Sequence, residues 1–229
     1  MFLDVSQLSV HYAGRSQRAV DQVSFSLQAG EIGVLIGPSG CGKTTLCRNA
    51  AAVEPVTYTI SCTTRAIRPG ERDGHDYFFL SPDEFTSRID AGEFLEHALV
   101  HGHHYGTLKS QVLPHLAAGR DVIMDLDVQG AAQLRACPDP AIRRALADVF
   151  ILLENMDELK ARLAGRRSES DDQLALRLTN AISEIRHWPD YRYALVSHSR
   201  EDDLREFRAI LAAERHHSSR LRLPTDFSP

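Results

Sequence analysis

Residues 37–44 carry the spacing G-x-x-x-x-G-K-[ST], with Gly37, Gly42, Lys43 and Thr44 at the defining positions. Glycines at this spacing let the backbone turn so that several loop amides point at one anion. The ammonium group of Lys43 would then reach the β- and γ-phosphates of a nucleotide, and the hydroxyl of Thr44 would bind Mg²⁺. The spacing therefore predicts a P-loop for ATP and Mg²⁺. The residues expected to contact ATP in this loop are Gly37, Ser39, Gly40, Cys41, Gly42, Lys43, Thr44 and Thr45.

The segments on either side of the loop favour the same interpretation. Residues 32–36 are an apolar run typical of a buried strand, and the chain from Thr44 onward can begin a helix. A helix N-terminus adds partial positive charge beside the phosphates. Cys41 has a side chain small enough for such a loop, and a catalytic thiol there is the less favoured reading.

A second group of anion-binding side chains follows in a stretch rich in glycine and proline. Arg65 and Arg68 flank Tyr77 and Tyr105 along this stretch. Guanidinium groups bind phosphate in a bidentate manner, and phenol hydroxyls supply neutral donors. Beside a P-loop, these four side chains predict a pocket for the phosphate of a nucleoside monophosphate.

Two carboxylates come at the end of a predicted buried strand in residues 119–127. Ligands of open α/β sheets bind at the carboxyl ends of the strands, which places Asp125 and Asp127 at the site. We expect Asp125 to hold the water shell of Mg²⁺ and Asp127 to face the monophosphate.

Composition excludes several classes of protein. The chain has 229 residues, of which 43% are hydrophobic and 25% charged, and its formal net charge is −5. These values are typical of a soluble protein of one or two domains and argue against nucleic-acid or membrane-surface partners. The four cysteines lack C-x-x-C spacing, and neither a membrane span nor a targeting segment is present, so we expect a cytoplasmic protein. A homo-oligomer remains open.

The first residues alternate in hydrophobicity and predict a short β-hairpin within residues 2–28. Together with the P-loop, about fifty residues resemble the start of an ABC-transporter ATPase domain. That resemblance implies that Tyr12 stacks on adenine, although Tyr12 could equally be a packing residue of the hairpin. The glutamine loop, the signature motif and the Asp-Glu strand of that family do not follow, so the resemblance does not extend to the whole chain.

From residue 59 the chain reads Thr-Ile-Ser-Cys-Thr-Thr-Arg-Ala-Ile-Arg-Pro-Gly-Glu-Arg-Asp-Gly-His-Asp-Tyr-Phe-Phe, which closely resembles guanylate kinase. The likeness continues through Gly-Glu-Phe-Leu-Glu-His-Ala, His-Tyr-Gly-Thr and Met-Asp-Leu-Asp-Val-Gln-Gly, and covers about three quarters of the chain. It implies that Glu96 accepts hydrogen bonds from N1–H and the 2-amino group of guanine. The other substrate-binding residues it implies are Ser61, Arg65, Arg68, Tyr77, Tyr105, Thr107 and Asp127.

The same resemblance implies a mobile lid at residues 164–175. Arg162, Arg166 and Arg177 match arginines that guanylate kinases bring onto the transferring phosphoryl group, and with Lys43 they are the catalytic candidates. Two departures stand out, because Arg167 replaces a usual glycine and Ser197-His198 replaces a usual Asn-Asp near the ATP base.

These observations predict an α/β fold: a three-layer P-loop nucleoside monophosphate kinase with a parallel core sheet. Residues 1–30 would form the β extension, residues 31–215 the kinase domain and residues 216–229 a flexible tail, with a monophosphate-binding lobe at 63–110. The expected reaction is the ATP-dependent phosphorylation of GMP, and of dGMP. The alternatives are a non-catalytic guanylate-kinase-like interaction module and a kinase for another phosphorylated small molecule, such as a ribose bisphosphate.

Overall fold

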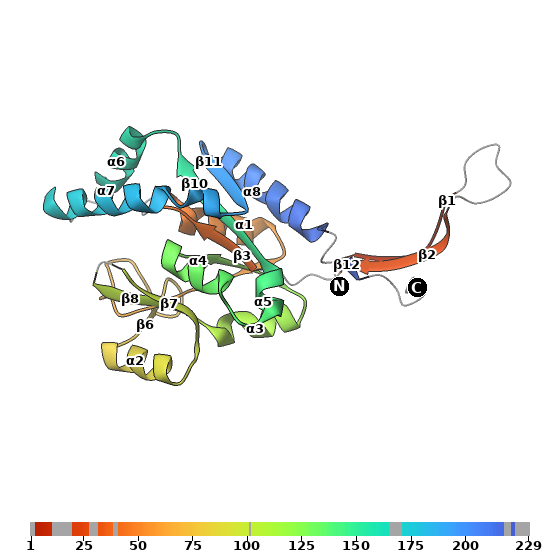
Figure 1. Cartoon of the computed structure of the whole chain (residues 1–229), viewed down its shortest axis with the longest axis horizontal. Coiled ribbons are helices and arrows are strands. Elements are labelled where there is room, and N and C mark those ends of the chain that lie inside the picture. The colour runs from red at the N-terminus through yellow and green to blue at the C-terminus, as the bar shows by residue number, and fades with distance from the viewer. Residues whose placement is uncertain are drawn as a thin grey trace.

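The computed structural model of the protein describes residues 3–10, 20–27, 32–38, 41–100, 102–164, 171–217 and 221–222. Its centre is a parallel sheet of five strands (Figure 1). In spatial order the strands are β11 (Tyr193–Ser197), β10 (Leu146–Leu153), β3 (Ile32–Ile36), β9 (Asp121–Asp125) and β4 (Val56–Tyr58). Strand β3 is buried along its whole length, as its continuous apolar sequence requires of a central parallel strand.

Helices cover both faces of this sheet, which gives the three layers expected (Figure 1). One face packs against α3 (Lys109–Ala117), α4 (Val128–Arg135) and α5 (Pro140–Ala145). The other face packs against α1 (Lys43–Val53) and α8 (Arg200–Arg215). In the part of the chain that is described, no helix combines the length and the apolar character needed to cross a membrane.

The order of the strands brings the predicted phosphate loop and the predicted metal ligand together. Strand β3 lies between β10 and β9, and Leu35 of β3 pairs with Asp125 of β9. Both strands run in the same direction, so their carboxyl ends lie at one edge of the sheet. The P-loop leaves β3 beside the end of β9.

A second sheet forms the lobe predicted at residues 63–110. Its four strands, in spatial order, are β6 (Phe78–Phe79), β5 (Cys62–Thr63), β8 (His103–Leu108) and β7 (Phe94–Val100). Helix α2 (Pro82–Asp90) covers one face, and Phe85 of this helix stacks on Phe94 at 4.4 Å between ring centroids. Ser81 and Glu84 form a capping box that fixes where α2 begins.

Two helices border the predicted lid. Helix α6 (Met156–Ala164) packs on α7 (Asp171–Ile185) through Leu159 and Ala181, and a short 3₁₀ helix, Trp188–Asp190, follows. Helix α7 already includes the last part of the predicted lid. Residues 165–170, its centre, lie outside the described residues.

The N-terminal hairpin is present, as β1 (Leu3–Val10) and β2 (Val20–Leu27) paired antiparallel. Its partner in the described chain is β12 (Leu221–Arg222), which pairs with β2 at the other end of the sequence. This three-stranded sheet is set apart from the core sheet (Figure 1). Part of the tail expected to be flexible is therefore a strand, because the edge of β2 offers it backbone hydrogen bonds.

Candidate functional site

The P-loop turns sharply where β3 ends, and its glycines are required there. Gly37 has a φ of 153°, and a Cβ at this position would lie 2.5 Å from the carbonyl oxygen of Ile151. Gly42 has a φ of 103° and is the residue immediately before α1. Residues other than glycine rarely adopt such φ values, so the backbone conformation of the loop requires glycine at both defining positions. The free N-terminal amides of α1 come directly after the loop.

Lys43, Thr44 and Asp125 meet at this loop. The Nζ of Lys43 donates to the carbonyl oxygens of Gly37, at 2.5 Å, and Pro38, at 3.4 Å. The hydroxyl of Thr44 donates to Oδ2 of Asp125 at 2.6 Å. The side chain of Lys43 therefore lies along the loop, and the side-chain oxygen atoms of Thr44 and Asp125 lie together at its end.

Tyr58 also contacts Asp125, which the sequence did not indicate. Its hydroxyl donates to Oδ1 of Asp125 at 2.9 Å from the neighbouring strand β4. Burial raises the pKa of Asp125, while the hydrogen bonds from Thr44 and Tyr58 and the charge of Lys43 act in the opposite direction. Hydroxyl and carboxylate oxygens are the ligands that Mg²⁺ prefers, and one carboxylate suffices when phosphates and water complete the shell.

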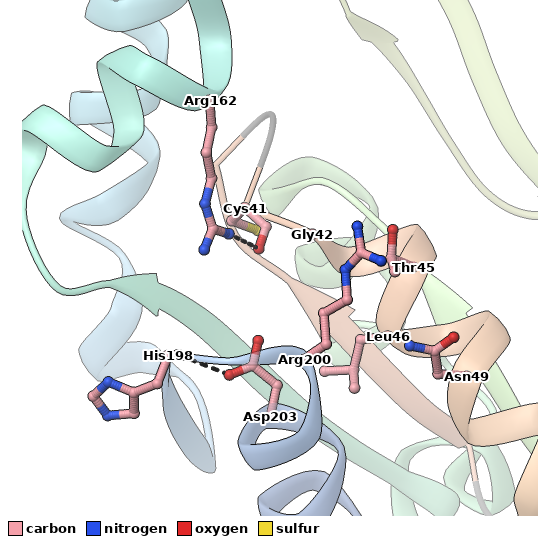
Figure 2. A pocket seen from close by; sticks show the side chains of 9 residues that line it. All are labelled: Cys41, Gly42, Thr45, Leu46, Asn49, Arg162, His198, Arg200 and Asp203. Atoms are coloured by element: carbon pink, nitrogen blue, oxygen red, sulfur yellow. Dashed lines mark hydrogen bonds between the residues drawn. The ribbon is translucent and has the colours of Figure 1, made fainter. Parts of the chain in front are cut away.

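A cavity of about 360 Å³ opens beside the P-loop and between α1, α6 and α8 (Figure 2). Arg162 extends from α6 toward the loop and donates to the carbonyl oxygen of Cys41 at 3.1 Å. A Cβ built on Gly42 would lie 3.8 Å from the same guanidinium group. Arg162, a predicted catalytic residue, therefore lies against the loop that would hold the phosphates.

The far side of this cavity contains residues that the sequence did not single out. Asn49 of α1 and Arg200 of α8 both line it, and Figure 2 shows their side chains on the side facing Arg162. Arg200 lies just after the carboxyl end of β11, the part of an α/β sheet where ligands bind, and that position was the available signal. Two guanidinium groups, an amide and the carboxylate of Asp203 give the cavity a polar lining with the hydrogen-bonding groups that a nucleotide could use.

Ser197 and His198 depart from the pattern of guanylate kinases, and His198 lines the same cavity while Ser197 is buried behind it. Asp203 accepts from the hydroxyl of Ser197 at 2.7 Å and from the backbone N–H of His198 at 2.8 Å. The Nδ1 of His198 lies 2.5 Å from a carboxylate oxygen of Glu154. These contacts hold the end of β11 in place and leave the imidazole ring at the rim.

In the lobe, Arg65 is buried and is held by a partner that the sequence did not reveal. Its guanidinium donates to both carboxylate oxygens of Glu71, at 2.8 and 3.0 Å. It also lies 5.5 Å from the centroid of the Tyr77 ring, which packs edge-on against Tyr105. Burial raises the pKa of Tyr77 to about 12, so this phenol stays a neutral donor.

Glu71 organises the loop that carries both arginines. It accepts from the backbone N–H of Arg68 at 2.8 Å while it pairs with Arg65. The side chain of Arg68 is exposed. An acidic residue three positions after Arg68 in a Gly/Pro-rich loop was the signal available in the sequence. The structure thus brings Arg65, Tyr77 and Tyr105 together and leaves Arg68 at the surface.

Glu96, the predicted base reader, is one of the few buried carboxylates among the described residues, with 4% of its surface exposed. It pairs in register with Thr107, whose hydroxyl lies 3.4 Å from that of Ser61. Burial raises the pKa of Glu96 to about 7, and the negative charge of Asp127 adds to this effect, while hydrogen bonding to Thr107 opposes it. Glu96, Thr107 and Ser61 therefore form one cluster, as the resemblance implied.

Asp127 has a structural role in addition to the one predicted. It precedes α4, and its Oδ1 accepts from the backbone N–H of Gly130 at 2.8 Å. Satisfying a free amide in this way stabilises the start of a helix. The carboxylate acts electrostatically on Glu96, so it lies close to the predicted guanine site, and its contact with substrate stays a prediction.

Several predicted residues cannot be placed. Tyr12, Ser39, Gly40, Arg166 and Arg167 lie outside the described residues, as does the side chain of Arg177 on α7. Cys41 is buried, and burial raises the pKa of its thiol, which disfavours the thiolate that catalysis would need. Thr45 lies at the edge of the cavity beside the P-loop.

Comparison with known proteins agrees with this geometry. The family model described as guanylate kinase matches residues 30–214. A guanylate kinase of Dechloromonas aromatica is 44% identical over 186 residues, covering 81% of this chain and 90% of that one. A guanylate kinase of Cereibacter sphaeroides is 40% identical over 183 residues, covering 80% and 85%.

The fold shows the same relationship. The crystal structure of guanylate kinase from Anaplasma phagocytophilum superposes with a TM-score of 0.72 at 30% sequence identity and covers 85% of this chain and 91% of that one. The residues matched by the family model, 30–214, include the P-loop, the lobe that holds Glu96 and the helices around the cavity, and they begin after the N-terminal hairpin. By its sequence and by its fold, this chain belongs to the guanylate kinase family.

Proposed function

We propose that the protein transfers the γ-phosphoryl group of ATP to GMP, giving ADP and GDP, and that dGMP is a second acceptor. In this reaction a phosphate oxygen of GMP bonds to the γ-phosphorus, and the bond from that phosphorus to the β–γ bridging oxygen breaks. The membership of the chain in the guanylate kinase family supports the reaction. The anion-binding side chains of the lobe support it as well, because Tyr77 interacts electrostatically with Asp125 beside the P-loop.

The single observation that carries the choice of acceptor is the buried carboxylate of Glu96. Guanine presents two donors, N1–H and the 2-amino group, on one edge, whereas adenine presents an acceptor at N1. A buried acceptor left without a donor costs on the order of 1–3 kcal/mol, which is enough to favour guanine over adenine. Thr107 and Ser61 lie beside this carboxylate and can bind other atoms of the base.

The remaining residues would position the phosphates. Arg65, Tyr77 and Tyr105 would bind the phosphate of GMP, and Lys43 with the P-loop amides would bind the phosphates of ATP. Arg162, already against the loop, would neutralise charge on the moving phosphoryl group, joined on lid closure by Arg166 and Arg177. Phosphoryl transfer needs no covalent catalyst, since in-line positioning and charge neutralisation account for its acceleration.

Mg²⁺ would be held by Thr44 and by Asp125, directly or through its water shell. The 2.6 Å contact between these two side chains already gathers the oxygen ligands at the end of the P-loop. When bound with ATP, Mg²⁺ neutralises charge on the β- and γ-phosphates. Tyr58 would fix the orientation of the Asp125 carboxylate from its other side.

A coupled assay of ADP release tests the proposal, with GMP, dGMP, AMP and a ribose bisphosphate as acceptors. We expect turnover with GMP and dGMP and at least a hundredfold lower kcat/KM with AMP. Turnover of the ribose bisphosphate in preference to GMP would contradict the assignment. Absence of turnover with every acceptor, in protein that unfolds cooperatively, would instead support a non-catalytic interaction module.

A further inference from the structure

Helix α4 contacts the edge strand of the lobe directly beside Glu96. Strand β7 pairs with β8 on one side, and its other side is an edge of the lobe sheet. Alternate residues of an edge strand present their N–H and C=O groups outward. In β7 one such residue is His97, the neighbour of Glu96.

Gln133 of α4 binds both of these outward groups of His97. Its Nε2 donates to the carbonyl oxygen at 2.6 Å, and its Oε1 accepts from the N–H at 3.1 Å. The amide of Gln133 uses its oxygen and one of its two N–H donors here, so it pairs with the strand as a single residue of a neighbouring strand would. The core helix is thereby joined to the lobe strand at one defined register.

The same face of α4 also limits where the Glu96 carboxylate can lie. Gly130 precedes Gln133 by three residues, and residues at this spacing share a helix face. A Cβ built on Gly130 would lie only 2.5 Å from Oε2 of Glu96. Gly130 therefore leaves the space that this carboxylate occupies, while Gln133 sets the position of the backbone that carries it.

We infer that Gln133 and Gly130 are positioning residues for guanine recognition, which together set the depth and direction of the Glu96 carboxylate. The inference rests on the proposed function, because it assumes that Glu96 reads the base. Neither residue needs to touch the substrate. Gln133 aligns the strand through the backbone of His97, and Gly130 admits the carboxylate against the helix.

The test uses the full-length protein and compares kcat/KM for GMP with that for IMP, which lacks the 2-amino group. The ratio of the two values does not depend on how much of the enzyme is folded. We expect Gln133→Met, which keeps side-chain length but loses both hydrogen bonds, to lower the GMP-to-IMP ratio about tenfold. KM for ATP should change by less than about twofold.

Gly130→Ala is the complementary variant, because its expected effect on folding has the opposite sign. Alanine favours the helical backbone over glycine, so this change should not weaken α4 itself. Its new methyl group must displace the Glu96 carboxylate, which is the movable end of a side chain. We expect the same loss of the GMP-to-IMP ratio, without a fall in Tm that could account for it.

Two controls separate a positioning role from a structural one. Gln111→Met removes a glutamine from α3 and should leave the ratio unchanged. In a Glu96→Gln background, both α4 variants should lose most of their effect on the ratio. Unchanged ratios in Gln133→Met and Gly130→Ala, or full effects in the Glu96→Gln background, would overturn the inference. If wild-type protein did not phosphorylate GMP, the proposed function itself would be wrong.

Discussion

Two carboxylates lie in the predicted metal and base sites, the half-buried Asp125 and the buried Glu96, and their hydrogen-bond partners differ. Asp125 accepts from the hydroxyls of Thr44 and Tyr58 and lies near the charge of Lys43. Glu96 has the hydroxyl of Thr107 as its main donor and is repelled by Asp127. An environment with few donors disfavours the ionised form. The carboxylate that would meet guanine is therefore the one with unused acceptor capacity.

The first prediction is that GMP binding releases a proton at and below neutral pH. The pKa of Glu96 is about 7 in the free protein, and the two donors of guanine favour the carboxylate, so binding lowers this pKa. GMP affinity should then fall by up to about tenfold per pH unit as the pH drops below 7. Calorimetry in buffers of different ionisation enthalpy measures the proton released.

The control for this prediction is Glu96→Gln, which cannot titrate. The phosphate of GMP has its own pKa near 6, so only the difference between wild type and variant reports on Glu96. Equal proton release by both proteins would contradict the prediction.

The raised pKa of Glu96 also makes the free energy of unfolding depend on pH. Because the folded pKa of about 7 exceeds the ordinary value of 4.5, the contribution of Glu96 is fully present below pH 4.5. This contribution to the free energy of unfolding is lost as the pH rises through 7.

At the scale of elements, buried ion pairs hold α8 against the end of the core sheet at which β9 begins. The Nε of Arg215 donates to Asp121 at the start of β9 at 2.9 Å, and its Nη1 lies 3.1 Å from Glu54 after α1. The side chains of Arg215 and Asp121 are 7% and 3% exposed. These ion pairs lie at the opposite end of the strands from the P-loop, so they support the fold and leave the site untouched.

The second prediction compares two arginines of α8 that share the partner Glu54. Arg215→Met should lower the free energy of unfolding by about 3–5 kcal/mol, because it takes the arginine partner from a buried aspartate. Arg208→Met should cost less than about 1 kcal/mol, because this arginine is 52% exposed. Urea denaturation monitored by circular dichroism provides both values. A similar decrease in the free energy of unfolding in both variants would show that burial does not determine how much each arginine stabilises the protein.

At the scale of the whole molecule, the N-terminal hairpin lies outside the part of the chain that matches the guanylate kinase family. The family match begins at residue 30, after both strands of the hairpin. Among the described strands, β1 pairs with β2, β2 pairs also with β12, and none of the three pairs with a strand of the core sheet. The edge of β2 that does not face β1 is paired with the C-terminal segment Leu221–Arg222.

The third prediction decides whether the hairpin takes part in ATP binding. If Tyr12 is a packing residue of the hairpin, Tyr12→Ala should change KM for ATP and KM for GMP equally and by less than about twofold. Stacking on adenine would be worth roughly 1–3 kcal/mol, and its loss would raise KM for ATP alone by tenfold or more. Steady-state kinetics with each substrate varied in turn separates the two. We expect the smaller, equal effects.

Much of this protein could be predicted from the sequence because the information is local. The P-loop needs glycines at two positions only five residues apart, and the structure shows why each backbone angle demands them. The central strand is a continuous apolar run, and the buried strand predicted from it at residues 32–36 is present as β3. Periodicity and turn chemistry act over a few residues, so they can be recognised without the fold.

Only the tertiary structure decided which distant residues meet. Tyr58 contacts Asp125 across 67 residues of sequence, and Arg162 contacts Cys41 across 121. The spacing between such residues is set by strand order and helix packing, and one sequence pattern fits many such arrangements. Gln133 had no motif of its own, yet folding places it on the backbone beside the predicted base reader. The residue types determined the chemistry available, and the packing of α4 and β4 on the core determined which side chains hold the reactive groups in place.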